Sequence, residues 1–110
     1  MNRSMSAASA LLLVSFFIPA AAMAAQYTLV IKNHRFSPNR LTVPANERVK
    51  LVIDNRDATV EEFESHDLHR EKLVPGHSKS VVWVGPLGAG TYHFYGEFHK
   101  ETAHGALIVK

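Results

Sequence analysis

Two short segments of this chain carry most of the side chains that could hold a metal ion. The first, VEEFESH at residues 60–66, contains three glutamates and a histidine. The second, TYHFYGEFH at residues 91–99, includes Glu97 and His99, which are two residues apart. On an extended strand this spacing places both side chains on one face, about 6.5–7 Å apart. The pattern therefore predicts that Glu97 and His99 converge on one cation.

The chain offers nitrogen and oxygen ligands but almost no sulfur. It has no cysteine, its three methionines lie within the first 25 residues, and all seven histidines lie after residue 33. Disulfides and thiolate ligands are therefore excluded, and loss of the N-terminal segment would exclude thioether ligands as well. What remains is the binding of a borderline or hard metal ion by histidine and glutamate.

The glutamates of the first segment divide between two faces if this segment is a strand, because side chains alternate along a strand. One face then holds Glu61, Phe63 and Ser65, and the other holds Glu62, Glu64 and His66. Glu61 and Glu64 can bind one ion only if the strand bends or ends near Phe63. Alternatively, the glutamates form a solvated face that protects a sheet edge from aggregation, and His99 is a half-buried, hydrogen-bonded histidine.

Residues 1–25 have the organisation of a secretory signal peptide. Arg3 precedes an apolar run at residues 10–18, and an Ala-Met-Ala sequence at residues 22–24 provides a cleavage site. We expect a cleaved leader at 1–25 and a single exported domain at 26–110; the alternative is an uncleaved N-terminal anchor. Beyond Arg3 the chain has 11 basic and 10 acidic residues and no basic stripe, which argues against a nucleic-acid partner.

The domain is predicted to be all-β. Short alternating or apolar runs separated by turn residues every 8–12 positions are typical of a β-sandwich. Seven or eight strands are expected, at residues 26–32, 40–43, 48–54, 60–65, 71–74, 79–84, 91–95 and 105–109. Residues 36–39 are predicted to be a turn, Trp83 to lie in the core, His93 on the outer face, and His34, His69 and His77 on the surface.

The C-terminal part of the chain resembles the cupredoxins. The segments GTYHFYGEFH at 90–99 and GALIV at 105–109 are similar to the last two strands of that family, and IDNRD at 53–57 resembles the strand and turn before its first histidine ligand. The resemblance implies a Greek-key β-sandwich with a metal site at one end, in the loops between strands.

The family's copper ligands are mostly replaced in this chain. Gly96 stands at the cysteine position, Ala103 or His104 near the methionine position, and Glu61 at the first histidine position. Only His99 keeps a ligand type. Blue-copper chemistry needs a thiolate with two imidazoles, so it is absent.

The replacements are similar to the EfeO-type cupredoxin-like proteins of bacterial ferrous-iron uptake, in the segments EFES at 62–65 and GEFH at 96–99. This resemblance implies a periplasmic location, an inner-membrane iron permease as partner, and a second periplasmic metal-binding protein. The candidate metal ligands are Glu61, Glu64, Glu97 and His99, with His66 and His104 in reserve.

The nature of the metal stays open at this point, because iron, manganese, zinc and copper all accept this ligand set. We expect iron or copper as the bound ion, and a binding protein rather than an enzyme, although a metal-dependent ferroxidase activity is compatible with the sequence. The alternatives are a periplasmic copper carrier and a metal-free β-sandwich that binds a partner through its loops.

Overall fold

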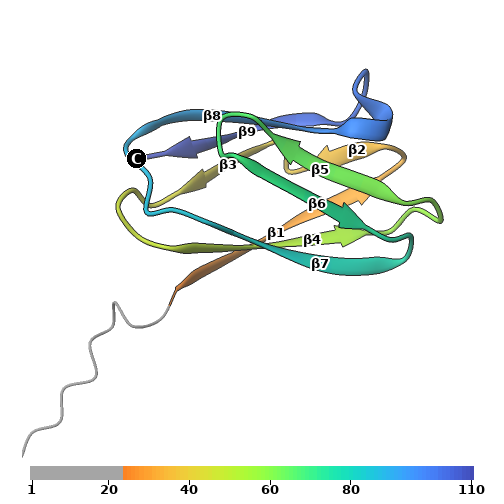
Figure 1. The fold of residues 1–110 in the computed structure, drawn as a ribbon, viewed down its shortest axis with the longest axis horizontal. Coiled ribbons are helices and arrows are strands. Elements are labelled where there is room, and N and C mark those ends of the chain that lie inside the picture. The colour runs from red at the N-terminus through yellow and green to blue at the C-terminus, as the bar shows by residue number, and fades with distance from the viewer. Residues whose placement is uncertain (1–23) are drawn as a thin grey trace, which may run out of the picture.

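The computed structural model describes residues 24–110, which form two β-sheets packed face to face (Figure 1). The strands are β1 (Ala25–Lys32), β2 (Arg35–Ser37), β3 (Arg40–Val43), β4 (Val49–Asn55), β5 (Glu61–Ser65), β6 (Arg70–Val74), β7 (Ser78–Val84), β8 (Gly90–Gly96) and β9 (His104–Val109), and a 3-10 helix, η3 (Glu97–His99), lies between β8 and β9. Most of the predicted leader, residues 1–23, lies outside the described residues, so its cleavage stays a prediction. Within the described part of the chain, no helix is long and apolar enough to cross a bilayer.

The predicted all-β sandwich is confirmed. One sheet has the strand order β2-β1-β4-β7 and the other has the order β3-β9-β8-β5-β6. The β1–β4 and β3–β9 pairs are parallel, and the remaining pairs are antiparallel. Each sheet therefore contains strands from both halves of the chain, and loops that are distant in sequence meet at the ends of the sandwich.

The described residues contain nine strands, because residues 35–37 form β2 where only a turn was predicted at 36–39. Asn33 and His34 both have positive φ angles, 53° and 56°. Two successive residues in this region make the tight reversal whose twist matches antiparallel strands. The chain therefore turns back at once, and β2 pairs with the end of β1.

The core follows the predicted alternation. Leu29 and Ile31 of β1 and Leu51 and Ile53 of β4 are fully buried, as expected from their spacing. Phe36, Phe63 and Phe94 pack against one another beside them, with ring centroids 5.0–6.2 Å apart. Such aromatic contacts bury large apolar surfaces with defined geometry, so the floor beneath the end loops is rigid.

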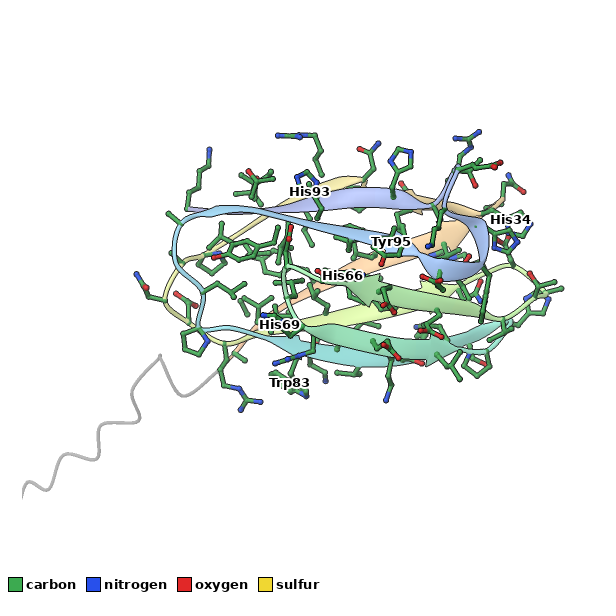
Figure 2. All side chains as sticks on the ribbon, turned by 45° about the horizontal axis from the view of Figure 1, so that its top comes forward. His34, His66, His69, Trp83, His93 and Tyr95 are labelled. Carbon is green, nitrogen blue, oxygen red and sulfur yellow. The ribbon has the colours of Figure 1, made fainter. Side chains whose placement is uncertain are left out.

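The prediction that Trp83 lies in the core is wrong. Its neighbours in β7, Val82 and Val84, are buried, whereas Trp83 is 38% exposed. Because successive side chains on a strand point to opposite faces, burial of the two valines forces the indole outward. Figure 2 shows Trp83 on the outside of the sandwich, on the side of β7.

The connection between β4 and β5 is tied to the β1–β2 turn by one carboxylate. Asp57 Oδ1 accepts a hydrogen bond from the backbone N–H of Asn33 at 2.8 Å, and Asp57 Oδ2 accepts one from that of His34 at 2.9 Å. The Asn55 side chain donates to the carbonyl of Thr59 and so shapes the same connection. Asp57 thereby fixes the backbone that carries His34.

We expect Asp57→Ala to lower the free energy of unfolding by about 1–3 kcal/mol, since it leaves two turn N–H groups without their charged acceptor. Asp54→Ala is the matched control: both side chains are 15% exposed, but among residues 24–110 the carboxylate of Asp54 pairs only with the exposed side chain of Arg56. The control should cost less than about 1 kcal/mol. Denaturant unfolding measures both, and equal losses would contradict the role given to Asp57.

Candidate metal site

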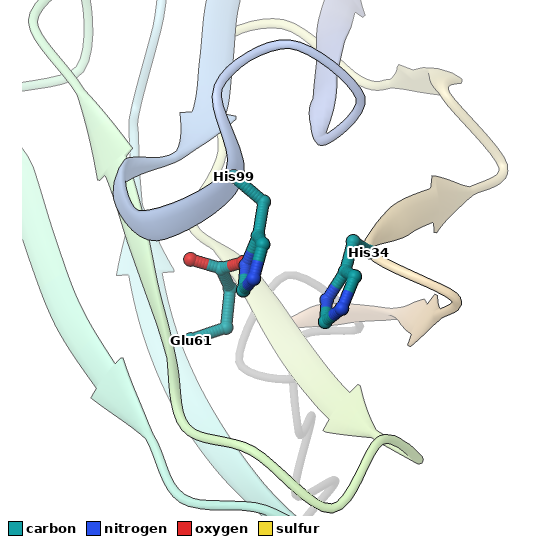
Figure 3. Close-up of side chains that lie close together, drawn as sticks. All are labelled: His34, Glu61 and His99. Atoms are coloured by element: carbon teal, nitrogen blue, oxygen red, sulfur yellow. The ribbon is translucent and has the colours of Figure 1, made fainter.

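Three side chains from distant parts of the sequence meet at one end of the sandwich (Figure 3). His34 comes from the β1–β2 turn, Glu61 begins β5, and His99 ends η3. One ligand atom of each residue lies within 4.8 Å of the other two. Together they present two imidazoles and a carboxylate to the same small volume.

Glu61 is a carboxylate in a core position. It is only 2% exposed. Its Oε1 accepts hydrogen bonds from the backbone N–H groups of Glu62 and Phe98, both at 3.0 Å. Its Oε2 lies 2.6 Å from Nδ1 of His99. A buried carboxylate is costly unless its oxygens are paired, and here both oxygens have partners.

His99 and His34 lie against each other at the solvent side of this carboxylate. Their ring centroids are 3.6 Å apart, and the planes differ by 12°. The side chains of His99 and His34 are 30% and 42% exposed. An open hollow of about 500 Å³ lies beside both rings and is also lined by Glu97, Phe98 and Lys100. The group is therefore reached from solvent through its histidines.

Asp57 adds negative charge behind His34. Its Oδ2 lies 3.5 Å from His34 Nδ1. Partial burial favours the neutral carboxyl, but the backbone N–H groups of His34 and Asn33, together with the nearby imidazoles of His34 and His99, hold the pKa of Asp57 below its ordinary value. Asp57 is therefore ionised at neutral pH and contributes to an environment that favours a cation.

Gly96 provides the space that Glu61 occupies. A Cβ atom at Gly96 would lie 2.7 Å from Cδ of Glu61 and 2.8 Å from Cβ of Ala103. Both distances are shorter than real contacts, so a side chain at residue 96 and the present position of Glu61 exclude each other. The carboxylate of Glu61 therefore occupies the space that a side chain at the family's cysteine position would need.

Glu61 and His99, two of the predicted ligands, lie together, but Glu64 does not join them. Strand β5 is regular, and Glu61, Phe63 and Ser65 are buried while Glu64 points to the outer face. There it lies in a second group with Glu62 and Glu71. Desolvation and the neighbouring carboxylate of Glu64 raise the pKa of Glu62. The bend near Phe63 that joint binding by Glu61 and Glu64 would require is absent.

The spacing argument for Glu97 and His99 is wrong, because the strand ends at Gly96. The next three residues form η3, and a 3-10 helix has three residues per turn, so residues two apart point in different directions. Glu97 is 37% exposed, and its Oε1 lies 3.5 Å from Nζ of Lys100. A ligand role for Glu97 stays a prediction.

The two reserve histidines lie elsewhere. His66 is 79% exposed and 4.0 Å from Glu64. His104 is exposed on β9 and lines a separate hollow with His93 on the outer face of the second sheet. His93 is exposed, as predicted from its alternation with buried Phe94. His69 and His77 are also exposed, as predicted.

His34 was missed by the sequence analysis. It was expected on the surface, whereas it is half-buried and belongs to the group with Glu61 and His99. One sequence signal was available: the Asn33-His34 pair between two strand-forming runs is typical of a tight hairpin turn. That signal places His34 at an end of the sandwich, but it does not reveal which other loops lie there.

Two imidazoles and one carboxylate form a donor set for a divalent transition metal. A blue-copper centre does not fit these residues, because the chain has no cysteine to supply a thiolate. With only three protein donors, a bound ion could also take ligands from the hollow beside His34 and His99. Open positions allow an ion to exchange with another ligand or to meet a second molecule.

The comparisons with known proteins point to one fold. The uncharacterized protein RP394 of Rickettsia prowazekii is 48% identical over 81 residues, which cover 74% of this chain and 65% of that protein. The chain thus spans less than two thirds of the length of this relative. Auracyanin A of Chloroflexus aurantiacus, a blue copper protein, has a TM-score of 0.68 at 16% identity, over 80% of this chain and 100% of its own.

A further similar structure is the metal-binding domain of the Cu(I)-exporting P-type ATPase CopA of Streptococcus pneumoniae, determined with Cu(I). Its TM-score is 0.69 at 10% identity, and the match covers 77% of this chain and 84% of that domain. At these identities the structural matches establish the fold alone. The family described as the cupredoxin-like domain matches residues 5–109. This chain therefore belongs to the cupredoxin-like domain family.

Proposed function

We propose that this protein binds a divalent transition metal through His34, Glu61 and His99. The observation that carries the proposal is the 2.6 Å contact between Glu61 Oε2 and His99 Nδ1, at a buried carboxylate beside a second imidazole. These two atoms share a hydrogen bond, and each is of a type that can bind a metal ion. Metal binding at these atoms would replace this hydrogen bond.

We further propose that the protein works in the periplasm in ferrous-iron uptake and passes iron to an inner-membrane permease, alongside a second periplasmic metal-binding protein. Two features support this role. The first is the resemblance of residues 62–65 and 96–99 to EfeO-type proteins. The second is the replacement of sulfur donors by a carboxylate and imidazoles, which suits Fe(II) better than Cu(I).

A periplasmic copper carrier is the second candidate. The two similar structures named above are those of a blue copper protein and of the metal-binding domain of a Cu(I)-exporting ATPase. Among simple nitrogen and oxygen sites, Cu(II) also binds more tightly than Fe(II). If copper occupies the site, it could assist the oxidation of iron. A metal-free interaction module is the third candidate, and metal titration separates it from the first two.

Addition of Fe(II) under anaerobic conditions, or of Cu(II), should raise the melting temperature of the protein, because a ligand of the native state stabilises it. His34→Ala and His99→Ala should weaken binding by about tenfold or more, since each removes a donor. His93→Ala is the control, because this histidine is exposed on the outer face of the second sheet. Calorimetric titration gives the affinities.

The comparison of Glu61→Gln with Glu64→Gln and Glu97→Gln locates the carboxylate ligand. Loss of affinity is expected for Glu61→Gln, whose folding is checked by circular dichroism, and a loss for Glu97→Gln or Glu64→Gln would add that carboxylate to the site. If Glu61→Gln is unstable, His34→Ala still decides the matter, because the half-buried His34 side chain lies at the solvent side of the group and folding of this variant is checked in the same way. Unchanged affinity in both folded variants would remove this group from consideration as the metal site.

Metal affinity should fall as the solution becomes more acidic, because coordination requires ionised carboxylates and neutral imidazoles and therefore releases protons. Titration between pH 7.5 and 5.5 should show progressively weaker binding with proton uptake by the freed site. His99→Ala should flatten this dependence. A flat profile for the unaltered protein would point to a site made of carboxylates alone.

Gly96→Ala should disturb the site directly. The new methyl group would collide with Cδ of Glu61, so we expect a stability loss of about 1–3 kcal/mol, as for other overpacked cores, together with weaker metal binding. Gly88→Ala is the matched control, because a Cβ there meets no atom within 4 Å. Unfolding curves and metal titration of both variants provide the measurement, and equal behaviour would refute the steric argument.

Iron and copper are distinguished by competition and by growth. Equilibrium competition between anaerobic Fe(II) and Cu(II) gives the intrinsic preference. Deletion of the gene should impair growth under iron limitation if the uptake role is right. A growth defect confined to copper stress or copper limitation would favour the copper carrier instead.

A further inference from the structure

The outer face of the β2-β1-β4-β7 sheet carries an apolar strip. Val52 of β4 is directly opposite Val81 of β7, and Trp83 follows two residues after Val81 on the same face. Val30 of β1 lies diagonally next to Val52, because Thr28 pairs with Val52. Val81 is 37% exposed and Trp83 is 38% exposed. This apolar strip (Val30, Val52, Val81 and Trp83) is therefore open to a partner.

Basic side chains surround the apolar strip. The guanidinium carbon of Arg48 lies 4.3 Å from the centroid of the Trp83 ring, and Nζ of Lys50 lies 5.9 Å from it. Further positive charges at its borders come from Lys32, Arg35 and Lys79. The carboxylate of Asp54 on the same face is engaged by Arg56 at 3.1 Å. The face is thus strongly positive.

The outer face of the other sheet has the opposite charge next to β5 and β6, where Glu62, Glu64 and Glu71 lie together. The net charge of the chain is nearly balanced, but these basic residues gather on the outer face of one sheet and these acidic residues on the outer face of the other, next to β5 and β6. No basic stripe was visible in the sequence, because the positive residues come from four strands and a loop that the fold brings together. The positive face arises because the β2-β1-β4-β7 sheet brings these residues together, and no single segment of the sequence contains them all.

We propose that the apolar strip and its basic border form a docking surface for an acidic partner protein. An apolar centre with tryptophan and arginine is the composition of energetically dominant interface residues, and a charged rim is the usual surrounding. Complementary charge would orient the partner and speed its association. This proposal does not rest on metal binding, because the apolar strip is separate from the His34–Glu61–His99 group.

A protein fits this surface better than a membrane or a nucleic acid. The valines of this face belong to regular strands, so they do not form a protruding apolar loop that could enter a bilayer. Binding to phosphates alone would use the lysines and arginines but leave Val52 and Val81 without a partner. An acidic polypeptide with interspersed apolar side chains matches both components.

The chain contains a single tryptophan, so its fluorescence reports on this surface directly. The probe is a soluble synthetic peptide in which glutamate alternates with leucine. We expect a saturable blue shift of Trp83 emission that weakens with added salt. Arg48→Glu combined with Lys50→Glu should abolish it. Arg40→Glu combined with Lys100→Glu, two exposed basic residues elsewhere, is the charge-matched control and should keep it.

Several results would overturn the proposal. These are no shift with the peptide, a shift that survives in the Arg48 and Lys50 variant, or an equal or larger shift with phosphatidylglycerol vesicles or single-stranded DNA. Sedimentation of the protein alone tests a second copy as the occupant: concentration-dependent association that the same variant abolishes would replace the acidic partner with self-association. Metal titrations of the variant should be normal, so this test fails or succeeds independently of the metal site.

Discussion

The carboxylate of Glu61 in the core is the constraint on which this end of the molecule depends. A carboxyl group that is only 2% exposed must be met by hydrogen-bond partners, and the chain meets it with two backbone N–H groups and the imidazole of His99. The turn of η3 supplies the partners from Phe98 and His99. Gly96, which has no side chain, leaves the space that the carboxyl group of Glu61 occupies. The loop after β8 is therefore organised around this one buried carboxyl group.

Two kinds of side chain surround this carboxyl group: packed aromatic rings on the core side and partly exposed imidazoles on the solvent side. The rings of Phe36, Phe63 and Phe94 pack against one another beneath the loops at this end. The two histidines, by contrast, are half-buried, have one side toward solvent and stack on each other. A fixed carboxylate with accessible imidazoles suits a protein that must take up an ion and release it again, since exchange requires ligands that solvent can reach.

The fold was largely predictable and the site only partly so. Alternation in β1 and β4 identified the buried residues, and in β5 it grouped Glu61 with Phe63 and Ser65, because a period of two is local information; that this face of β5 is the buried one came only from the structure. The direction of Glu97 was not predictable, because the strand ends at Gly96 and the chain turns there. His34 and Trp83 were misplaced for another reason: their positions depend on which loops and strands are neighbours. That is set by pairing between distant segments, which a single sequence does not display.

The three members of the candidate site come from residues 34, 61 and 99, so most of the domain separates the first from the last. An unfolded or partly synthesised chain cannot bring them together, and any ion held by one of them alone would be weakly bound. If these residues bind a metal as proposed, loading would follow completion of the fold, including strands β8 and β9. Sheets built from such long-range pairs form slowly, so binding would be delayed until these pairs have formed.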